Sequence, residues 1–283
     1  MAIKVFADEL DFTRLHTRAV PDYLWQNYRW AYVHPTAVRI FEREWLINLI
    51  LWGNFGRLRD SALNELGVTI NGRTLQVACV YGDFSERLAE RLGPGSRLDV
   101  VDVLEIQLQN LRAKLAASAP VTLYVRDSTR LGFGGGGYDQ VVIFFLLHEQ
   151  PETVRRQTLA EALRVIRPGG KLVIVDYHLP RRLHPLRYLF YPILRVLEPF
   201  ALDLWYRQIC EWLPRGAPVA QICKQTFCGG LYQKLVITAS SAAAAKAPIS
   251  YDEVGKEMDT PGATSRPRRT PAHRPRLAVG CML

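Results

Sequence analysis

Cysteine is scarce in this sequence, and the spacing of the few cysteines excludes two kinds of site. Only five occur among 283 residues, and no two of them form a C-x-x-C pair. Without such pairs, neither a zinc site nor a disulfide framework is indicated. We therefore expect free thiols and a reducing compartment.

Long apolar runs and targeting signals are also missing. The longest apolar stretch of the expected core, residues 141–147, is far too short to span a bilayer. Residues 1–4 lead into acidic residues instead of an apolar run, so we expect no signal peptide. Cys281 stands one position too late for a prenylation box. These features predict a cytoplasmic protein.

The chain is basic and has enough apolar residues for a core. Its net charge of +9 and pI near 9.5 favour a polyanionic partner, either nucleic acid or an anionic membrane face. Part of that charge lies after residue 239 and has to be discounted first, because this tail carries Arg266, Arg268, Arg269, Arg274 and Arg276. The tail has almost no aromatic residues, and we expect residues 240–283 to be disordered.

The spacing of apolar residues divides the rest of the chain into two parts. Residues 1–65 are rich in aromatic side chains at helical spacing, which predicts a helical cap. Residues 66–239 alternate between strands and helices, which is typical of a parallel, doubly wound α/β sheet. The expected strands are residues 75–80, 97–103, 121–125, 141–147 and 171–176, with a closing antiparallel hairpin at 222–227 and 232–239.

Residues 178–212 interrupt this alternation. They are rich in Leu, Phe, Tyr, Pro and Arg, and they read as short helices separated by prolines. Arg181, Arg182, Arg187 and Arg195 alternate with apolar and aromatic residues, a pattern that suits a segment resting on lipid headgroups. A lid whose apolar face packs on the sheet fits the pattern equally well, and both interpretations stay open.

Two acidic positions follow expected strands. Asp102 ends the second strand, about 20 residues beyond the turn at Gly82, where a carboxylate can accept hydrogen bonds from both hydroxyls of a ribose. A solvated or helix-capping acid is the alternative. Asp127 and Ser128 end the third strand, where they can accept a bond from an adenine amino group or simply open a turn. The four glycines at 134–137 lack a following Lys-Ser/Thr and favour a flexible loop over a phosphate loop.

A third polar group follows the later strands. His148 lies just past the buried strand at 141–147, and Asp176 and His178 end the next strand. Because residues i and i+2 of a strand share a face, Asp176 and His178 are expected to converge at the carboxyl edge of the sheet, where open α/β sheets bind ligands. Imidazole with carboxylate suits a divalent metal or general base catalysis. A single histidine in a supporting or solvent contact is the alternative.

Several of these residues together carry a family resemblance. The run from Ala162 to Leu172, which contains Pro168-Gly169-Gly170, resembles the helix–turn–strand signature of class I S-adenosylmethionine-dependent methyltransferases. The likeness extends over about residues 28–239 and is nearest to the ubiquinone/menaquinone C-methyltransferases. It implies a Rossmann-like, mostly parallel seven-stranded sheet that binds S-adenosylmethionine. The cofactor-binding positions that it implies are Gln76, Ala78, Val80, Gly82, Asp102, Val103, Asp127, Ser128 and Phe144.

The first turn departs from that family. Gln76 stands where the family has an acid, and Ala78 and Val80 replace two glycines, so that only Gly82 remains. The run from Val80 to Ser85, together with residues 144–150 and 176–178, resembles the methyltransferase-like rhodoquinone biosynthesis family. This resemblance implies that a ring methoxy group of ubiquinone is replaced by an amino group from S-adenosylmethionine, with manganese assisting, at a peripheral site on the inner membrane. It further implies Tyr81 and His178 as catalytic residues and His148, Asp176 and His178 as metal ligands.

This amino transfer is chemically reasonable as a hypothesis. A methoxyquinone is a vinylogous ester, so an amine can add to the ring carbon and expel methoxide, and a Lewis acid on the carbonyl would help. The amine must be neutral to attack, and Gln76 in place of an acid favours the neutral form. The alternatives are a quinone C- or O-methyltransferase and a non-catalytic scaffold at the membrane. Nucleic acid is not an expected partner, because residues 176–178 differ from the Asn/Asp-Pro-Pro-aromatic motif that holds a base amine.

Overall fold

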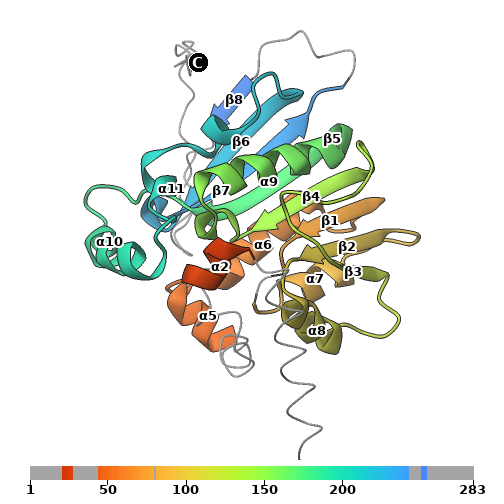
Figure 1. Ribbon diagram of the computed structural model, residues 1–283, viewed down its shortest axis with the longest axis horizontal. Coiled ribbons are helices and arrows are strands. Elements are labelled where there is room, and N and C mark those ends of the chain that lie inside the picture. The colour runs from red at the N-terminus through yellow and green to blue at the C-terminus, as the bar shows by residue number, and fades with distance from the viewer. Residues whose placement is uncertain (1–20, 28–43, 80, 242–249, 254–283) are drawn as a thin grey trace, which may run out of the picture.

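The computed structural model describes residues 21–27, 44–79, 81–241 and 250–253 (Figure 1). Most of them belong to one sheet with strand order β3-β2-β1-β4-β5-β7-β6-β8. The strands are β1 (Arg73–Val77), β2 (Arg97–Asp102), β3 (Val121–Val125), β4 (Tyr138–Phe144), β5 (Ile166–Tyr177), β6 (Val219–Phe227), β7 (Tyr232–Ala239) and β8 (Ser250–Glu253). The expected seven-stranded, mostly parallel sheet is confirmed for β1–β7, and β8 adds an eighth strand.

The register of the sheet brings the carboxyl ends of its central strands together. Strands β1 to β5 pair in parallel, with Val77 opposite both Val101 of β2 and Ile143 of β4. Strand β7 runs antiparallel between β5 and β6, which confirms the predicted closing hairpin. The residues that follow β1, β2, β4 and β5 therefore meet at one edge, where open α/β sheets bind their ligands.

Helices cover the sheet and gather at that edge. The helices are α2 (Asp22–Asn27), α5 (Glu44–Ile50), α6 (Phe55–Leu66), α7 (Phe84–Glu90), α8 (Glu105–Lys114), α9 (Glu152–Val165), α10 (Pro185–Leu197) and α11 (Asp203–Tyr206). In Figure 1, α2, α5 and α10 lie on one side of the molecule, near the arrowhead of β4. None of the described helices has both the length and the apolar character that crossing a bilayer requires.

The core continues from the sheet into the helical cap. The rings of Phe84 and Phe144 are stacked with their centroids 4.3 Å apart, and Phe55 of α6 meets Phe144 edge to face at 6.3 Å. All three side chains are almost fully buried. Burial of aromatic rings of this size contributes about 2–3 kcal/mol each, so this cluster fixes α6 and α7 against the end of β4.

Several predicted boundaries were wrong, for local reasons. Strand β1 ends at Val77, not at residue 80, because Ala78 takes a left-handed φ of 67°. Strand β4 spans Tyr138–Phe144 instead of 141–147, because Phe145 has a φ of 53° and a 3₁₀ turn follows at Leu147–Glu149. Part of the tail that was expected to be disordered forms β8, which pairs in parallel with β6.

Candidate functional site

A cavity of about 700 Å³ opens at the carboxyl edge of the sheet. Its walls come from the ends of β1, β2, β3, β4 and β5 and from α2, α5 and α10. This volume is typical of small-molecule sites. Of the sequence-predicted site residues, the cavity is lined by Ala78, Tyr81, Asp102, Val103, Asp127, Ser128, Phe144 and His148. Asp176 lies directly behind His148, whereas Gln76, Gly82 and His178 are not part of the lining, and Val80 lies outside the described residues.

Asp102 supplies a buried carboxylate to one wall. Its Oδ2 accepts a hydrogen bond from the backbone N–H of Cys79 at 2.9 Å, and its Oδ1 accepts one from Leu104 N at 2.8 Å. Burial raises the pKa of Asp102 to about 6, although the backbone hydrogen bonds act in the opposite direction. Asp102 is therefore no solvated acid: it joins the first turn to the start of α8 and faces the cavity.

Asp127 and Ser128 extend this wall along β3. Asp127 Oδ1 accepts hydrogen bonds from the backbone N and the Oγ1 of Thr129, both at 2.8 Å. This is the geometry of an aspartate that opens a turn, one of the two roles considered from the sequence. Ser128 Oγ accepts a bond from Gln150 Nε2 at 3.0 Å and lies 2.8 Å from Thr158 Oγ1. Both residues also line the cavity, so the turn presents them to a ligand.

The first turn is shaped by its departures from the glycine-rich pattern. Gln76 is fully buried, and its Nε2 donates to Ala78 O at 3.0 Å and to Ser85 Oγ at 2.8 Å. Ala78 adopts a conformation that costs an L-residue about 1–2 kcal/mol, and its side chain lines the cavity. At Gly82, an added Cβ would lie 2.7 Å from the Phe55 ring, so only glycine fits. The amide of Gln76 therefore supports the turn from behind.

Tyr81 is held at the cavity by a residue of α8. Its hydroxyl accepts a hydrogen bond from Gln107 Nε2 at 2.9 Å, and both residues line the cavity. Gln107 is buried in the first turn of the helix that Asp102 anchors. The position of the Tyr81 ring is thus coupled to the same carboxylate that orients the first turn.

His148 and Asp176 form a buried pair on the opposite wall. His148 Nδ1 lies 2.9 Å from Asp176 Oδ1, and the backbone N–H groups of Leu147 and Tyr177 also donate to this carboxylate, at 2.8 and 2.7 Å. Burial is the largest single influence and would lower the pKa of His148, but the charge and hydrogen bond of Asp176, together with the charges of Glu198 and Glu149, outweigh it and raise that pKa to about 9. Because Asp176 engages Nδ1, Nε2 is the ring nitrogen that can reach a ligand. It lies 3.8 Å from Glu149 Oε1.

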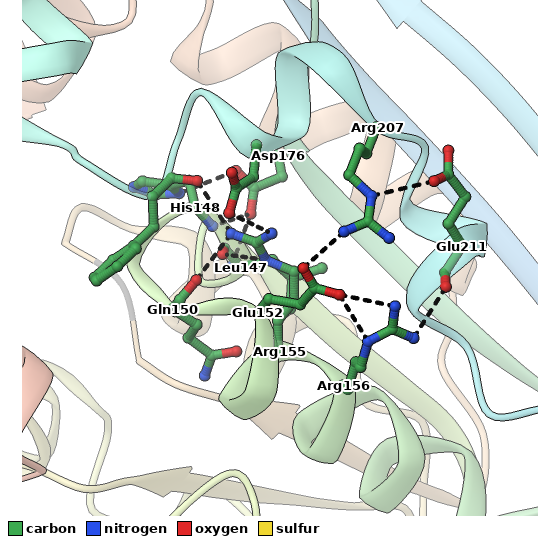
Figure 2. A network of polar contacts seen from close by, with 11 residues as sticks. Leu147, His148, Gln150, Glu152, Arg155, Arg156, Asp176, Arg207 and Glu211 are labelled. Atoms are coloured by element: carbon green, nitrogen blue, oxygen red, sulfur yellow. Dashed lines mark hydrogen bonds and ion pairs between the residues drawn. The ribbon is translucent and has the colours of Figure 1, made fainter.

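Arg155 fixes the turn that carries His148. Figure 2 shows its guanidinium beside Leu147 and Gln150, to whose carbonyl oxygens Nε and Nη2 donate at 3.0 and 2.8 Å. Nη2 also donates to Phe200 O at 3.0 Å, and the guanidinium lies 4.2 Å from the centroid of the Trp212 ring. A fully buried arginine with this many acceptors joins the His148 turn to the segment beyond α10.

The predicted convergence of His178 with Asp176 is not found. His178 Nδ1 lies 2.7 Å from Gly230 O, and Nε2 lies 3.0 Å from Lys224 Nζ, so the ring is turned toward β6 and the loop before β7. Both oxygens of Asp176 are already engaged by His148 and by backbone N–H groups. Across the described ranges, no three His, Cys, Asp or Glu side chains come together as they would around a metal ion. The ligand set proposed for manganese does not fit this structure.

Sequence reasoning missed several residues of the cavity wall, and Tyr23 and Phe145 show why. Tyr23 of α2 lines the cavity, and burial followed by the nearby charge of Glu149 raises its pKa. Phe145 also lines it and meets the rings of His148 and Tyr177 edge to face at 6.0 and 5.6 Å. Tyr23 lies far from the sheet in sequence, and no local pattern distinguishes it from the other aromatic residues of the cap. Phe145 reads as a core residue within an apolar run.

The central part of the chain is similar in sequence to known methyltransferases. Residues 74–170 match the family described as "Methyltransferase domain". The ubiquinone/menaquinone biosynthesis C-methyltransferase of Geobacter sulfurreducens is 32% identical over 158 residues, which cover 54% of this chain and 60% of the relative. A demethylmenaquinone methyltransferase of Staphylococcus aureus is 29% identical over 135 residues, which cover 48% of this chain and 55% of the relative. The chain thus spans less than two thirds of the length of these relatives.

Solved structures agree with the fold. An O-methyltransferase family protein from Burkholderia thailandensis superposes with a TM-score of 0.54 at 20% identity, covering 69% of this chain and 59% of that one. The phosphoethanolamine N-methyltransferase 2 of Haemonchus contortus, solved with S-adenosylhomocysteine, also gives 0.54, at 14% identity and with 78% and 59% covered. Together with the strand order, these likenesses show that the chain has the Rossmann-like class I methyltransferase fold.

Proposed function

We propose that this protein transfers a group from S-adenosylmethionine to the ring of a lipophilic quinone. The observation that carries the proposal is that one cavity contains a carboxylate wall suited to a nucleoside and an opposite, apolar wall that carries a histidine and suits a quinone with a lipid tail. The names of the relatives support a quinone as acceptor and a methyl group as the group transferred. Residues 66–239 would bind the donor, and residues 178–212 would cover it together with the described part of the predicted helical cap, of which residues 1–20 and 28–43 lie outside the described residues.

The β2 and β3 wall is assigned to the donor. Asp102 and Asp127 would accept hydrogen bonds from the ribose hydroxyls and the adenine amino group, and Ser128 and Val103 would flank the base. The left-handed backbone at Ala78 turns the first loop toward the same space. When bound, S-adenosylmethionine supplies an electrophilic methyl group on its sulfonium. The donor set of this wall fits that ligand without any metal ion.

The opposite wall is assigned to the quinone ring. Phe145, Phe190 and Leu194 provide apolar surface, and His148 is the polar group among them. With its pKa raised to about 9, His148 is protonated at neutral pH, so its Nε2–H can donate to a ring oxygen and stabilise negative charge there. The reduced form of the quinone would be the nucleophile, because its ring carbon can bond to the methyl group as the sulfonium C–S bond breaks and S-adenosylhomocysteine leaves. Glu149 lines the cavity beside His148, where its carboxylate can accept the proton that this ring carbon then loses.

A second candidate, amino transfer with loss of a ring methoxy group, is favoured by the chemistry of the first turn. Residues 76–82 contain no Asp or Glu, and the position where methyltransferases resembling this chain carry an acid holds the neutral amide of Gln76. A donor amine there would meet no acidic side chain from the turn itself to keep it protonated, and the neutral form is the nucleophile. In this alternative, His148 polarises the quinone carbonyl in the role first assigned to a metal.

One labelling experiment separates the two candidates. The purified chain is incubated with a quinone, its reduced form and S-adenosylmethionine that carries ¹³C in the methyl group and ¹⁵N in the amine. If the first candidate is correct, we expect mass spectrometry to find ¹³C on the ring of a product that retains every methoxy group. A product that gains ¹⁵N and loses one methoxy group would establish the second candidate, and an unlabelled quinone under all conditions would contradict both.

Two matched histidine variants test the assignment of the polar group. His148→Gln is expected to lower turnover by about 10²-fold or more, because it removes the charged donor from the cavity. His178→Gln is expected to stay within about threefold, because this ring faces Gly230 and Lys224 instead of the cavity. Equal losses in the two variants would contradict the assignment of His148.

A further inference from the structure

The mouth of the cavity is surrounded by apolar side chains that face outward. They come from two helices that are far apart in the sequence, α5 with the turn after it and α10. Trp52 and Phe190 join them, with ring centroids 5.7 Å apart. We name this surface the mouth face, and it consists of Trp45, Leu49, Trp52, Leu189, Ile193 and Val196, all exposed.

Helix α10 has a wider apolar stripe than the cavity requires. Phe190 and Leu194, at i and i+4, are buried and line the cavity. Leu189, Ile193 and Val196, at i, i+4 and i+7, form a parallel stripe on the outer side, and Val196 is 78% exposed. A helix that only closes a pocket needs the first stripe. The second stripe requires another apolar environment.

The charges on this helix and its approach are of one sign. Residues 179–197 contain four arginines and no Asp or Glu. Arg181, Arg182 and Arg195 are exposed, and Arg187 donates to Pro180 O at 2.9 Å. Arginines beside exposed apolar and aromatic side chains complement an anionic lipid surface, where the heads pair with phosphates and the apolar stripe enters the acyl boundary.

From this arrangement we infer that the mouth face docks on an anionic bilayer, so that the cavity opens directly into the lipid. The inference rests on the proposed function for the identity of what enters, a quinone with a long apolar tail. Ile193 and Leu197 of α10 are exposed and also line the cavity that contains His148, so they connect the outer surface of the helix with the apolar interior of the cavity. Such a substrate then reaches the ring site without passing through water.

The test uses the full chain and vesicles of phosphatidylcholine, with and without phosphatidylglycerol. We expect flotation with the anionic vesicles and weak binding to the neutral ones. Val196→Glu is expected to weaken vesicle binding about tenfold or more, because it places a charge in the apolar stripe. Arg182→Gln is expected to weaken it about fivefold at low salt, with the loss reduced at high salt.

Two matched controls lie at the opposite edge of the sheet. Val68, which is 86% exposed, precedes β1, and Arg97 is the exposed first residue of β2. Val68→Glu and Arg97→Gln make the same chemical changes far from the mouth, and both should leave vesicle binding within about twofold of the unmodified chain. Equal melting temperatures for Val196→Glu and Val68→Glu would show that folding is intact.

Several outcomes would overturn the inference. The unmodified chain could fail to float with anionic vesicles. Val196→Glu could bind as tightly as Val68→Glu. Sedimentation could show that the unmodified chain is a dimer and that Val196→Glu is a monomer with unchanged flotation. This result would assign the mouth face to contact with a second copy of the chain.

Turnover distinguishes this inference from the proposed function. With both correct, Val196→Glu loses turnover on a long-tailed quinone in vesicles and keeps it on a short-tailed quinone in solution. If neither quinone reacts while the flotation pattern holds, the proposed function fails and the docking surface stands. If Val196→Glu loses flotation but keeps turnover on the long-tailed quinone, docking occurs but does not deliver the substrate, and delivery from lipid is wrong.

Discussion

Two buried carboxylates, one on each wall of the cavity, show how the same group acquires different roles. Asp102 ends β2 and Asp176 lies near the end of β5, and both accept backbone N–H groups. Burial raises the pKa of Asp102 to about 6. Asp176 instead has an imidazole against it, and its charge raises the pKa of His148 to about 9 in spite of burial. The first carboxylate remains an acceptor for a ligand, and the second places a cation in the cavity.

The difference follows from the segment that lies against each carboxylate. After β2 the chain enters α8 at once, so Asp102 orders the helix start and the first turn through their backbone groups. Beside β5, the 3₁₀ turn at Leu147–Glu149 brings Nδ1 of His148 within hydrogen-bond distance of the Asp176 carboxylate. Arg155 stabilises that turn by donating to the carbonyl oxygen of Leu147.

The largest expected effect comes from removing the charge of Asp176. Asp176→Asn keeps the size of the side chain but leaves His148 without its counter-ion, and we expect it to cost about 3 kcal/mol of unfolding free energy. Because the folded pKa of His148 is raised, this stabilisation is complete below its ordinary value of 6.5 and is lost as the pH rises through about 9. Denaturant unfolding across this range measures it.

A double variant makes this prediction specific to the pair. His148→Gln with Asp176→Asn should cost clearly less than the sum of the two single changes, because either one removes the interaction. If Asp176→Asn destabilises equally at low and high pH, the carboxylate acts through its backbone bonds and not through His148. The contrast between the two walls would then disappear.

The second prediction concerns the β2 wall and has the opposite pH dependence. As the pH falls through about 6, Asp102 becomes protonated and loses acceptor capacity, so binding of S-adenosylmethionine should weaken by up to about tenfold per pH unit. Calorimetric titrations on both sides of this pH measure the change. In Asp102→Asn, binding should be weaker and nearly independent of pH in this range, and an unchanged pH dependence would assign it to another group.

The smallest expected effect tests the turn between the two walls. Ala78 has a φ of 67°, where glycine avoids the steric cost but loses more entropy on folding, so Ala78→Gly should stabilise the chain by about 0.5 kcal/mol. Thermal unfolding measures the shift. A destabilised variant would mean that the methyl group of Ala78 contributes more packing at the cavity wall than its backbone strain costs.

Much of the fold could be predicted from the sequence because the signals are local. The alternation of apolar runs with helical periodicity and the glycines at 229 and 230 are readable from neighbouring residues. The turn predicted at residues 168–170 was wrong, because these residues belong to β5, which begins at Ile166 and not at residue 171. The positions of Asp102, Asp127 and His148 at the cavity followed from the rule that strand ends meet at one edge. The ends of β1, just before Ala78, and of β4, just before Phe145, were predicted three residues too late, because non-glycine residues seldom take positive φ.

The sequence alone determined the α/β class, the order of strands and helices, and which side chains stand at the carboxyl edge, since periodicity and strand polarity depend on neighbours in the chain. Only the tertiary structure decided that His148 pairs with Asp176 while His178 turns away. It also decided that Tyr23 reaches the cavity and that Trp52 meets Phe190 at its mouth. Those outcomes depend on side-chain direction and on packing between distant segments, which sequence spacing does not encode.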